Sequence, residues 1–222
     1  MTTLSKKDIL DAIKKGSISF NPELDKYQIQ PNSIDIRLGN VFYVPKTWEY
    51  DEKGRHALIV DHLDLKDKKE NFKILNLKPG QYFEILPNEF IIVSTAEEIN
   101  LKAPDIMAVM YARSSVIRRG LIIESGVVDV GYCGYLVIPI VNNTNGQIIR
   151  LYPGERICQL VFHSLSGGIS DEEAQKHGML CAKYEGSTVY NLESRSDSSE
   201  ETRLIKDGKI KELKEKYKLD DF

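Results

Sequence analysis

Residues 121–162 read LIIESGVVDVGYCGYLVIPIVNNTNGQIIRLYPGERICQLVF, and this stretch decides the fold class. Short apolar or alternating runs, such as YLVIPIV and ICQLVF, are separated by Gly-Tyr, Asn-Gly and Pro-Gly pairs. The same pattern extends over the chain from Ile18 to Phe162. Many short strands between regular turn signals are typical of a barrel or sandwich, so the sequence predicts a mainly β fold.

The N-terminal segment predicts one short helix before the first strand. Ser5 is a residue type that caps helices, and the following pattern continues to Lys15. Apolar side chains recur there at helical spacing, so we expect Ile9, Leu10 and Ile13 to form the buried side of the helix.

Two charged segments lack a strand pattern. Residues 46–73 are weakly periodic, which indicates an exposed excursion between strands. We expect one β domain over residues 1–195, followed by a polar linker and an amphipathic helical tail over 196–222. The apolar residues at roughly helical spacing in this tail are Leu204, Ile210, Leu213 and Tyr217. A frayed charged tail is the alternative.

Composition excludes several classes of protein. The 222-residue chain has a net charge of -3 at pH 7, whereas a general nucleic-acid binder normally has a basic surplus. Its cysteines are far apart and form no Cys/His cluster, which argues against a zinc site or a disulfide framework. The sequence has no apolar signal-peptide region and no run near the ~18 apolar residues of a membrane span. We therefore expect a cytoplasmic protein with no nucleic-acid or membrane partner.

Hydroxyl and basic side chains gather in the run RSSVIRR, a short span before a lone acid. The run contains Arg113, Ser114, Ser115 and Arg118, and such donors suit phosphate oxygens. The acid, Asp129, could hold a sugar hydroxyl or activate a water. The combination indicates a nucleotide site with hydrolytic chemistry. The alternative for RSSVIRR is a helix cap followed by a basic surface turn.

Three further patterns each have a functional and a structural interpretation. Residues 126–134, GVVDVGYCG, predict a β-hairpin in which Tyr132 either contacts a sugar or packs into the core. Gln159 lies in a mostly apolar strand, so its amide either joins a structural network or contacts a ligand. Asp35 and Arg37 alternate with apolar residues, which also suits a half-buried strand with a solvated face.

Four of these runs, taken in order, resemble the motifs of the dUTPase / dCTP deaminase superfamily in its deaminase-like branch. They are PNSIDIRLGN at 31–40, ARSSVIRRGL at 112–121, GVVDVGYCG at 126–134 and PGERICQLVF at 153–162. CAKYEGSTVY at 181–190 is similar to the branch's C-terminal segment, which folds over the triphosphate. The resemblance implies a distorted β-barrel or jelly-roll subunit in a homotrimer. It also implies active sites between subunits, with Mg²⁺ bound mainly by the nucleotide phosphates.

The resemblance implies a role for each matching residue. Asp129 matches the acid that contacts deoxyribose and orients the water attacking the α-phosphorus. Asp35 matches an acid linked to Mg²⁺ through water, as suits an ion that keeps most of its waters. Ser187 stands where the family has glutamine. The implied substrate-binding residues are Arg113, Ser114, Ser115, Arg118, Gly126, Tyr132, Gln159, Lys183 and Ser187.

One position distinguishes the activities within this family. Deaminases carry a catalytic glutamate in the strand after the third motif, and this chain has Pro139 there, which cannot transfer protons. We therefore predict a dUTP diphosphatase that forms dUMP and diphosphate. Two alternatives stay open. One is a dCTP deaminase, or a bifunctional dCTP deaminase/dUTPase, that uses a displaced acid such as Glu124. The other is a non-catalytic nucleotide-sensing or regulatory protein.

Overall fold

The computed structural model of the chain describes residues 2–60, 71–170, 176–177, 180–181, 186–192 and 197–218. The chain divides into two compact units. The first comprises Met1–Pro45 and Phe72–Leu192, and the second comprises Lys46–Asn71 and Glu193–Phe222. The division into domains over 1–195 and 196–222 stays a prediction.

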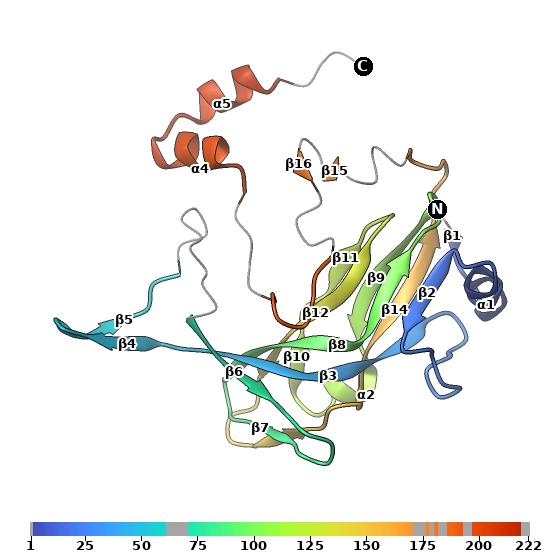
Figure 1. The fold of residues 1–222 in the computed structure, drawn as a ribbon, viewed down its shortest axis with the longest axis horizontal. Helices are drawn as coiled ribbons and strands as arrows, with labels where there is room; N and C mark the ends of the chain where they lie inside the picture. Colours follow the sequence, from blue (N-terminus) through green and yellow to red (C-terminus); the bar gives the residue numbers. More distant parts are fainter. Residues whose placement is uncertain are drawn as a thin grey trace. The chain divides into compact units, whose positions relative to one another are not determined.

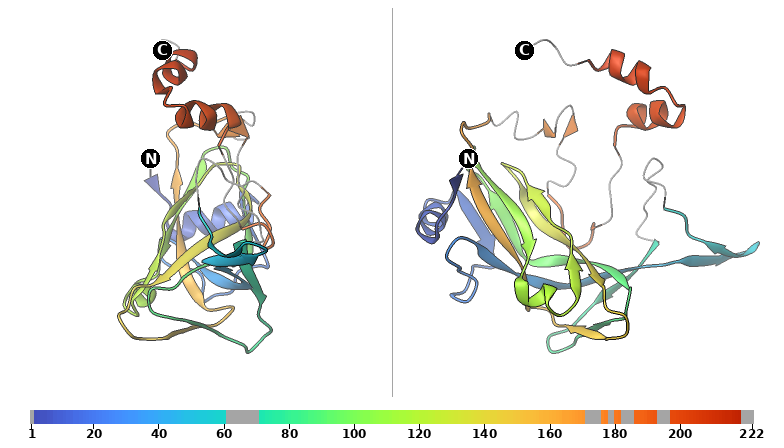
Figure 2. Two further views of the ribbon diagram at one scale, coloured as in Figure 1. Left: turned by 90° about the vertical axis from the view of Figure 1, so that its left-hand side faces the viewer. Right: turned by 180° about the vertical axis from the view of Figure 1, so that it is seen from behind.

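Antiparallel strands make up the first unit. They are β1 (Thr2–Thr3), β2 (Ile18–Asn21), β3 (Ile34–Pro45), β6 (Phe72–Asn76), β7 (Phe83–Ile85), β8 (Phe90–Leu101), β9 (Ile106–Ala112), β10 (Leu121–Ile123), β11 (Gly126–Val128), β12 (Cys133–Asn142), β13 (Ile149–Leu151), β14 (Arg156–Ser164), β15 (Lys176–His177) and β16 (Leu180–Cys181). The large sheet has the order β10-β12-β8-β3-β14-β9-β11, with β1, β2 and β6 attached beside this path. Figures 1 and 2 show that this sheet curls strongly into a half-barrel. The predicted mainly β, dUTPase-like fold is confirmed.

The alternating sequence of β12 shows why the sheet encloses one core. Along Cys133–Asn142, buried and half-buried residues alternate without interruption. Leu136, Ile138 and Ile140 therefore point into the core, whereas Pro139 lies on the half-exposed side. The apolar residues of β3, β8, β9 and β14 complete the same core.

The predicted N-terminal helix is confirmed as α1 (Lys6–Lys14). Ser5 and Asp8 cap it reciprocally, because each side chain accepts a hydrogen bond from the backbone N–H of the other residue. The prediction for Leu10 is wrong, since this side chain is 41% exposed and Ala12 is buried instead. Ile9 and Ala12 are buried on one face, and the predicted Ile13 is half-buried against the core beside them.

The second unit contains one hairpin and two helices. The hairpin, β4 (Trp48–Asp51) and β5 (Gly54–Ala57), is largely exposed, and its Arg55 guanidinium lies over the Trp48 ring. The predicted tail forms two helices, α4 (Ser199–Lys206) and α5 (Ile210–Lys216). Ser198 caps α4, so helix begins within the polar linker that the sequence predicted. Gly208, with a φ of 71°, separates the helices.

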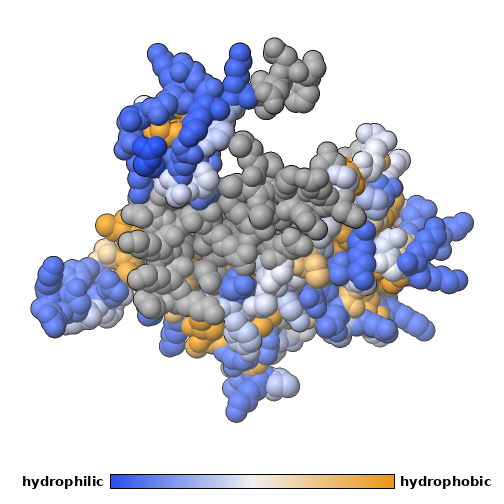
Figure 3. All heavy atoms as spheres, turned by 45° about the horizontal axis from the view of Figure 1, so that its top comes forward, coloured by the Kyte–Doolittle hydropathy of each residue, from blue (hydrophilic) through white to orange (hydrophobic). Residues whose placement is uncertain are grey.

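Figure 3 shows mainly hydrophilic side chains over the β4–β5 hairpin and over the helix pair. Within the described part of the chain, every helix is too short or too polar to cross a membrane.

Candidate active site

A buried carboxylate held by two guanidiniums forms the centre of the candidate site. Asp35, on β3, is only 2% exposed. Its Oδ2 atom forms an ion pair with Arg113 Nε at 3.0 Å. The same atom accepts hydrogen bonds from Arg156 Nη1 at 3.1 Å and Gln30 Nε2 at 3.3 Å. Burial raises the pKa of the Asp35 carboxyl, and the positive charges of Arg113 and Arg156 oppose that rise. We call these four residues the Asp35 cluster.

Strand register brings this cluster together from distant parts of the chain. β14 pairs with β3 so that Gln159 lies opposite Asp35. β14 also pairs with β9, whose last residue, Ala112, precedes Arg113. The Arg113 Nη1 atom donates to the Arg156 carbonyl at 2.9 Å. The strand face that carries Asp35 is therefore covered by side chains, and the predicted solvated face is wrong.

A second layer behind the cluster was not anticipated from the sequence. Gln28 Nε2 donates both to the Asp35 carbonyl at 3.0 Å and to Glu97 Oε1 at 2.7 Å. The Arg37 N–H donates to Glu97 Oε2 at 3.0 Å. Glu97 is 2% exposed, and burial raises the pKa of its carboxyl against these two hydrogen bonds. The available signal was an acidic residue within the largely apolar strand β8.

The predicted phosphate-binding residues lie at a short helical turn. Arg113 is the N-cap of α2 (Ser114–Ile117), and its guanidinium is engaged by Asp35. Ser114, Ser115 and Arg118 are exposed. Their side chains make no hydrogen bond or ion pair within the described residues. Three polar side chains are thus oriented by the backbone of one turn and remain available to an anion.

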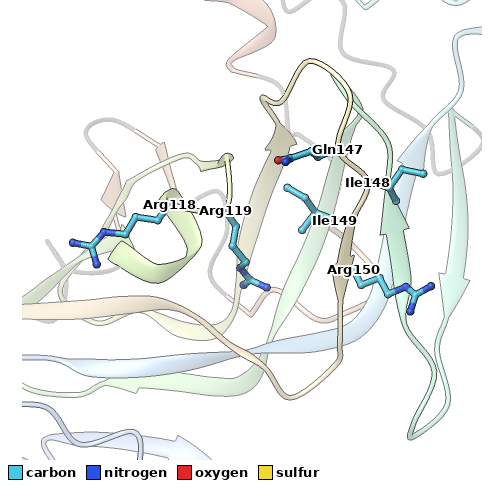
Figure 4. Close-up of a pocket in the computed structure, with 6 residues that line it drawn as sticks. All are labelled: Arg118, Arg119, Gln147, Ile148, Ile149 and Arg150. Atoms are coloured by element: carbon cyan, nitrogen blue, oxygen red, sulfur yellow. The ribbon is translucent and has the colours of Figure 1, made fainter.

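A surface hollow of about 460 Å³ lies beside α2 and is lined by Arg118, Arg119, Gln147, Ile148, Ile149 and Arg150. Figure 4 shows Gln147 and Ile149 directed towards Arg119, whereas Arg118 and Arg150 extend away on opposite sides. Arg119 is paired with Glu155 at 2.6 Å, and Arg150 with Glu84 at 2.9 Å. Since these two guanidiniums already have carboxylate partners, the hollow itself is a weak anion site.

The predicted catalytic acid, Asp129, lies exposed in the turn between β11 and β12. The Tyr132 N–H donates to the Asp129 carbonyl at 3.2 Å and closes this turn. The predicted hairpin over 126–134 is wrong, because β11 pairs with β9 and β12 pairs with β8 and β10. Leu101 bonds the turn to β8 instead: its carbonyl accepts from the Gly131 N–H, and its N–H donates to the Tyr132 carbonyl.

Tyr132 and Ser187 form hydrogen bonds and packing contacts within the chain. The Tyr132 ring packs against the core, and its hydroxyl donates to the Tyr135 carbonyl at 2.8 Å. Ser187 is 3% exposed, and its carbonyl accepts from the Tyr135 N–H at 2.9 Å. Gly126 lies exposed on β11, opposite Met110. The predicted Lys183 lies outside the described residues.

In the Asp35 cluster, the carboxylate is paired with arginines and is not arranged to bind a metal ion directly. The Asp35 Oδ2 atom already accepts hydrogen bonds from Arg156 and Gln30 and forms an ion pair with Arg113. Among the described residues, no three His, Cys, Asp or Glu side chains gather closely enough to hold a metal ion. No chemical step is therefore assigned to Mg²⁺, which stays a prediction.

Comparison with known proteins identifies the family. A family model described as dCTP deaminase-like matches residues 3–165, and the chain belongs to this family. A Methanopyrus kandleri protein named "dCTP deaminase, dUMP-forming" is 36% identical over 191 residues, covering 84% of this chain and 92% of the relative. A Methanosphaera stadtmanae protein of the same name is 32% identical over 215 residues, covering 94% of this chain and all of the relative.

A solved structure supports the fold. The dCTP deaminase of Agrobacterium tumefaciens superposes with a TM-score of 0.56 at 22% identity, covering 77% of this chain and 50% of that chain. The prediction of a dUTP diphosphatase is wrong, because the relatives that span most of the chain are named for dCTP deamination. Pro139 alone therefore does not distinguish the two activities in this chain.

Proposed function

We propose that the protein converts dCTP into dUMP, as the name of its relatives describes for them. The main support is the extent of the match to proteins named "dCTP deaminase, dUMP-forming", which reaches 94% of this chain. The overall conversion consumes two waters. One replaces the cytosine amino group, which leaves as ammonia, and the other attacks the α-phosphorus, so that diphosphate leaves.

The exposed polar residues fit the phosphate part of this reaction. Ser114, Ser115 and Arg118 offer hydroxyl and guanidinium donors that suit phosphate oxygens. Asp129 is the exposed carboxylate of the adjoining turn and would accept a proton from the attacking water. The Asp35 cluster would fix the start of α2 through Arg113 rather than contact the substrate.

We also propose a homotrimer in which neighbouring subunits complete each site. Val127 is 62% exposed and Ile117 is 57% exposed, and both lie next to predicted site residues. Burial of such apolar side chains against another subunit would be favourable. Light scattering coupled to size exclusion should give three times the mass of the chain, and a monomer at assay concentrations would contradict this assembly.

The function is tested by incubating the protein with dCTP and measuring ammonia, diphosphate and dUMP. We expect all three products in equal amounts. Asp129→Asn should lower dUMP formation at least ~100-fold, the lower range for loss of a general base, while nucleotide binding persists. Absence of ammonia from dCTP with the unmodified protein would refute the proposed function.

A further inference from the structure

Deamination requires a group that moves protons between water and the pyrimidine ring. Pro139 on β12 has no such group, although its side of the strand is half-exposed. Within this chain, a neighbouring strand can place an acid beside residue 139, because directly opposite residues of an antiparallel pair share one face and lie ~5 Å apart between Cβ atoms. The register of β12 with its neighbours identifies the candidate.

Glu124 occupies the position opposite Pro139. β10 pairs with β12 so that Ile122 lies opposite Val141 and Ile123 opposite Ile140. One residue further in the same register, Glu124 lies opposite Pro139. The Glu124 N–H donates to the Pro139 carbonyl at 3.4 Å.

Burial of the paired residues alternates along β10 and β12. The pair of Ile123 and Ile140 is buried, whereas Ile122 is exposed and Val141 is half-buried. Glu124 is exposed and Pro139 is half-buried, so both lie on the accessible face. Figure 1 shows β10 and β12 side by side.

Pro139 also determines where the chain leaves the ladder. A proline has no N–H, so Pro139 cannot return a hydrogen bond to the Glu124 carbonyl. β10 accordingly ends at Ile123, and β11 begins at Gly126. Glu124 therefore lies where the phosphate-binding turn of α2 leads into the segment that carries Asp129.

Other nearby acids are less suitable. Glu97 is buried and receives hydrogen bonds from Gln28 and from the Arg37 N–H. Glu98 is half-exposed but lies opposite Tyr135. Tyr135 is four positions from Pro139, which is roughly 13 Å along a strand. Only Glu124 combines an accessible carboxylate with a position directly opposite residue 139 among these acids.

We propose that Glu124 is the catalytic acid and base of deamination, an inference that rests on the proposed function. Its carboxylate takes one proton from water as the water oxygen bonds to C4 of cytosine. One proton of the water ends on N3 of the ring and the other on the amino nitrogen. The C4–N bond then breaks, ammonia leaves, and C4=O forms, so that Glu124 is again a carboxylate.

Glu124→Gln tests this role with two substrates measured separately. With dCTP, ammonia release should fall at least ~100-fold, the lower range for loss of a general acid or base. With dUTP, diphosphate release should stay within ~3-fold of the unmodified protein, since that step does not use Glu124. Glu98→Gln is the matched control and should leave both rates unchanged. In a Glu124→Gln background, Pro139→Glu should restore part of the ammonia release.

The outcomes separate this inference from the proposed function. If the unmodified protein releases no ammonia, the proposed function fails and Glu124 has no role to explain. Ammonia release that survives Glu124→Gln leaves the function standing and overturns the inference. A parallel loss of both activities, together with no recovery by Pro139→Glu, indicates a structural role and also overturns it.

Discussion

The Asp35 cluster and the segment from Glu124 to Gly134 are built in opposite ways. In the cluster, a buried carboxylate is bonded to two guanidiniums and an amide, with a further polar layer behind it. In the segment, Glu124 and Asp129 are exposed, and the turn is fixed through backbone hydrogen bonds to Leu101. The polar side chains of the cluster are thus buried and hold one another, whereas Glu124 and Asp129 are exposed to solvent.

The largest expected effect comes from removing the charge at the centre of the cluster. Asp35→Asn keeps the shape of the side chain but leaves Arg113 and Arg156 without their carboxylate. Breaking a buried ion pair from one side costs about 3 kcal/mol or more, so urea unfolding should show a loss of that size.

The control for this prediction is Glu155→Gln, which breaks the more exposed pair with Arg119. It should cost less than about 1 kcal/mol, as is usual for surface pairs. Equal costs for the two variants would contradict the view that the Asp35 cluster is a structural frame.

A smaller effect is expected where the segment from Glu124 to Gly134 contacts residues 186–187. Gly134 has a φ of 148°, and an added Cβ would lie 2.8 Å from the Ser187 nitrogen and 3.0 Å from its oxygen. Because these are backbone atoms, Gly134→Ala must displace residues 186–187 or strain its own backbone, at about 2 kcal/mol. We expect lower stability and faster proteolysis near these residues.

Gly146→Ala provides the comparison for this variant, because nothing lies within 4 Å of its added Cβ. It should leave both measurements nearly unchanged. Unaltered proteolysis of Gly134→Ala would show that the contact with Ser187 does not hold the C-terminal segment in place.

The strands and the first helix could be predicted because their signals are local. Alternation along β12 and the Ser5 cap need only neighbouring residues. The Asp35 cluster could not be predicted in this way, because Arg156 is 121 residues from Asp35 along the chain. Their contact depends on the register of β14 against β3, which no local pattern encodes.

The same limit explains two wrong predictions, one about strand pairing and one about function. The glycines of residues 126–134 predicted a turn correctly, but glycines specify a turn and not the partners of its flanking strands. Position 139 was interpreted within its own strand, where proline excludes acid-base chemistry. Glu124 could be named from the sequence as a displaced acid, but its place opposite Pro139 follows only from the pairing of β10 with β12.

The smallest effect should come from the layer behind the cluster and concerns pH. Burial raises the pKa of Glu97 in the folded chain. At a pH between the pKa of the unfolded chain and that of the folded chain, the folded chain therefore binds more protons. The stabilisation from Glu97 is therefore fully present when the pH is below the carboxyl's pKa in the unfolded chain, about 4.3. It is lost as the pH rises through the pKa in the folded chain. Glu97→Gln removes this dependence at a cost of about 1 kcal/mol for one disturbed hydrogen bond.

Urea unfolding of the unmodified protein and of Glu97→Gln at a series of pH values measures the contribution of Glu97 to stability. The stability of the unmodified protein minus that of Glu97→Gln should decrease as pH rises from about 4 towards neutrality. Glu98→Gln, at the adjacent half-exposed acid, reports what removal of a nearby charge does alone. A difference that stays constant with pH for Glu97→Gln would mean that this carboxylate is hydrated, and that the polar layer behind Asp35 is as open to water as the segment from Glu124 to Gly134.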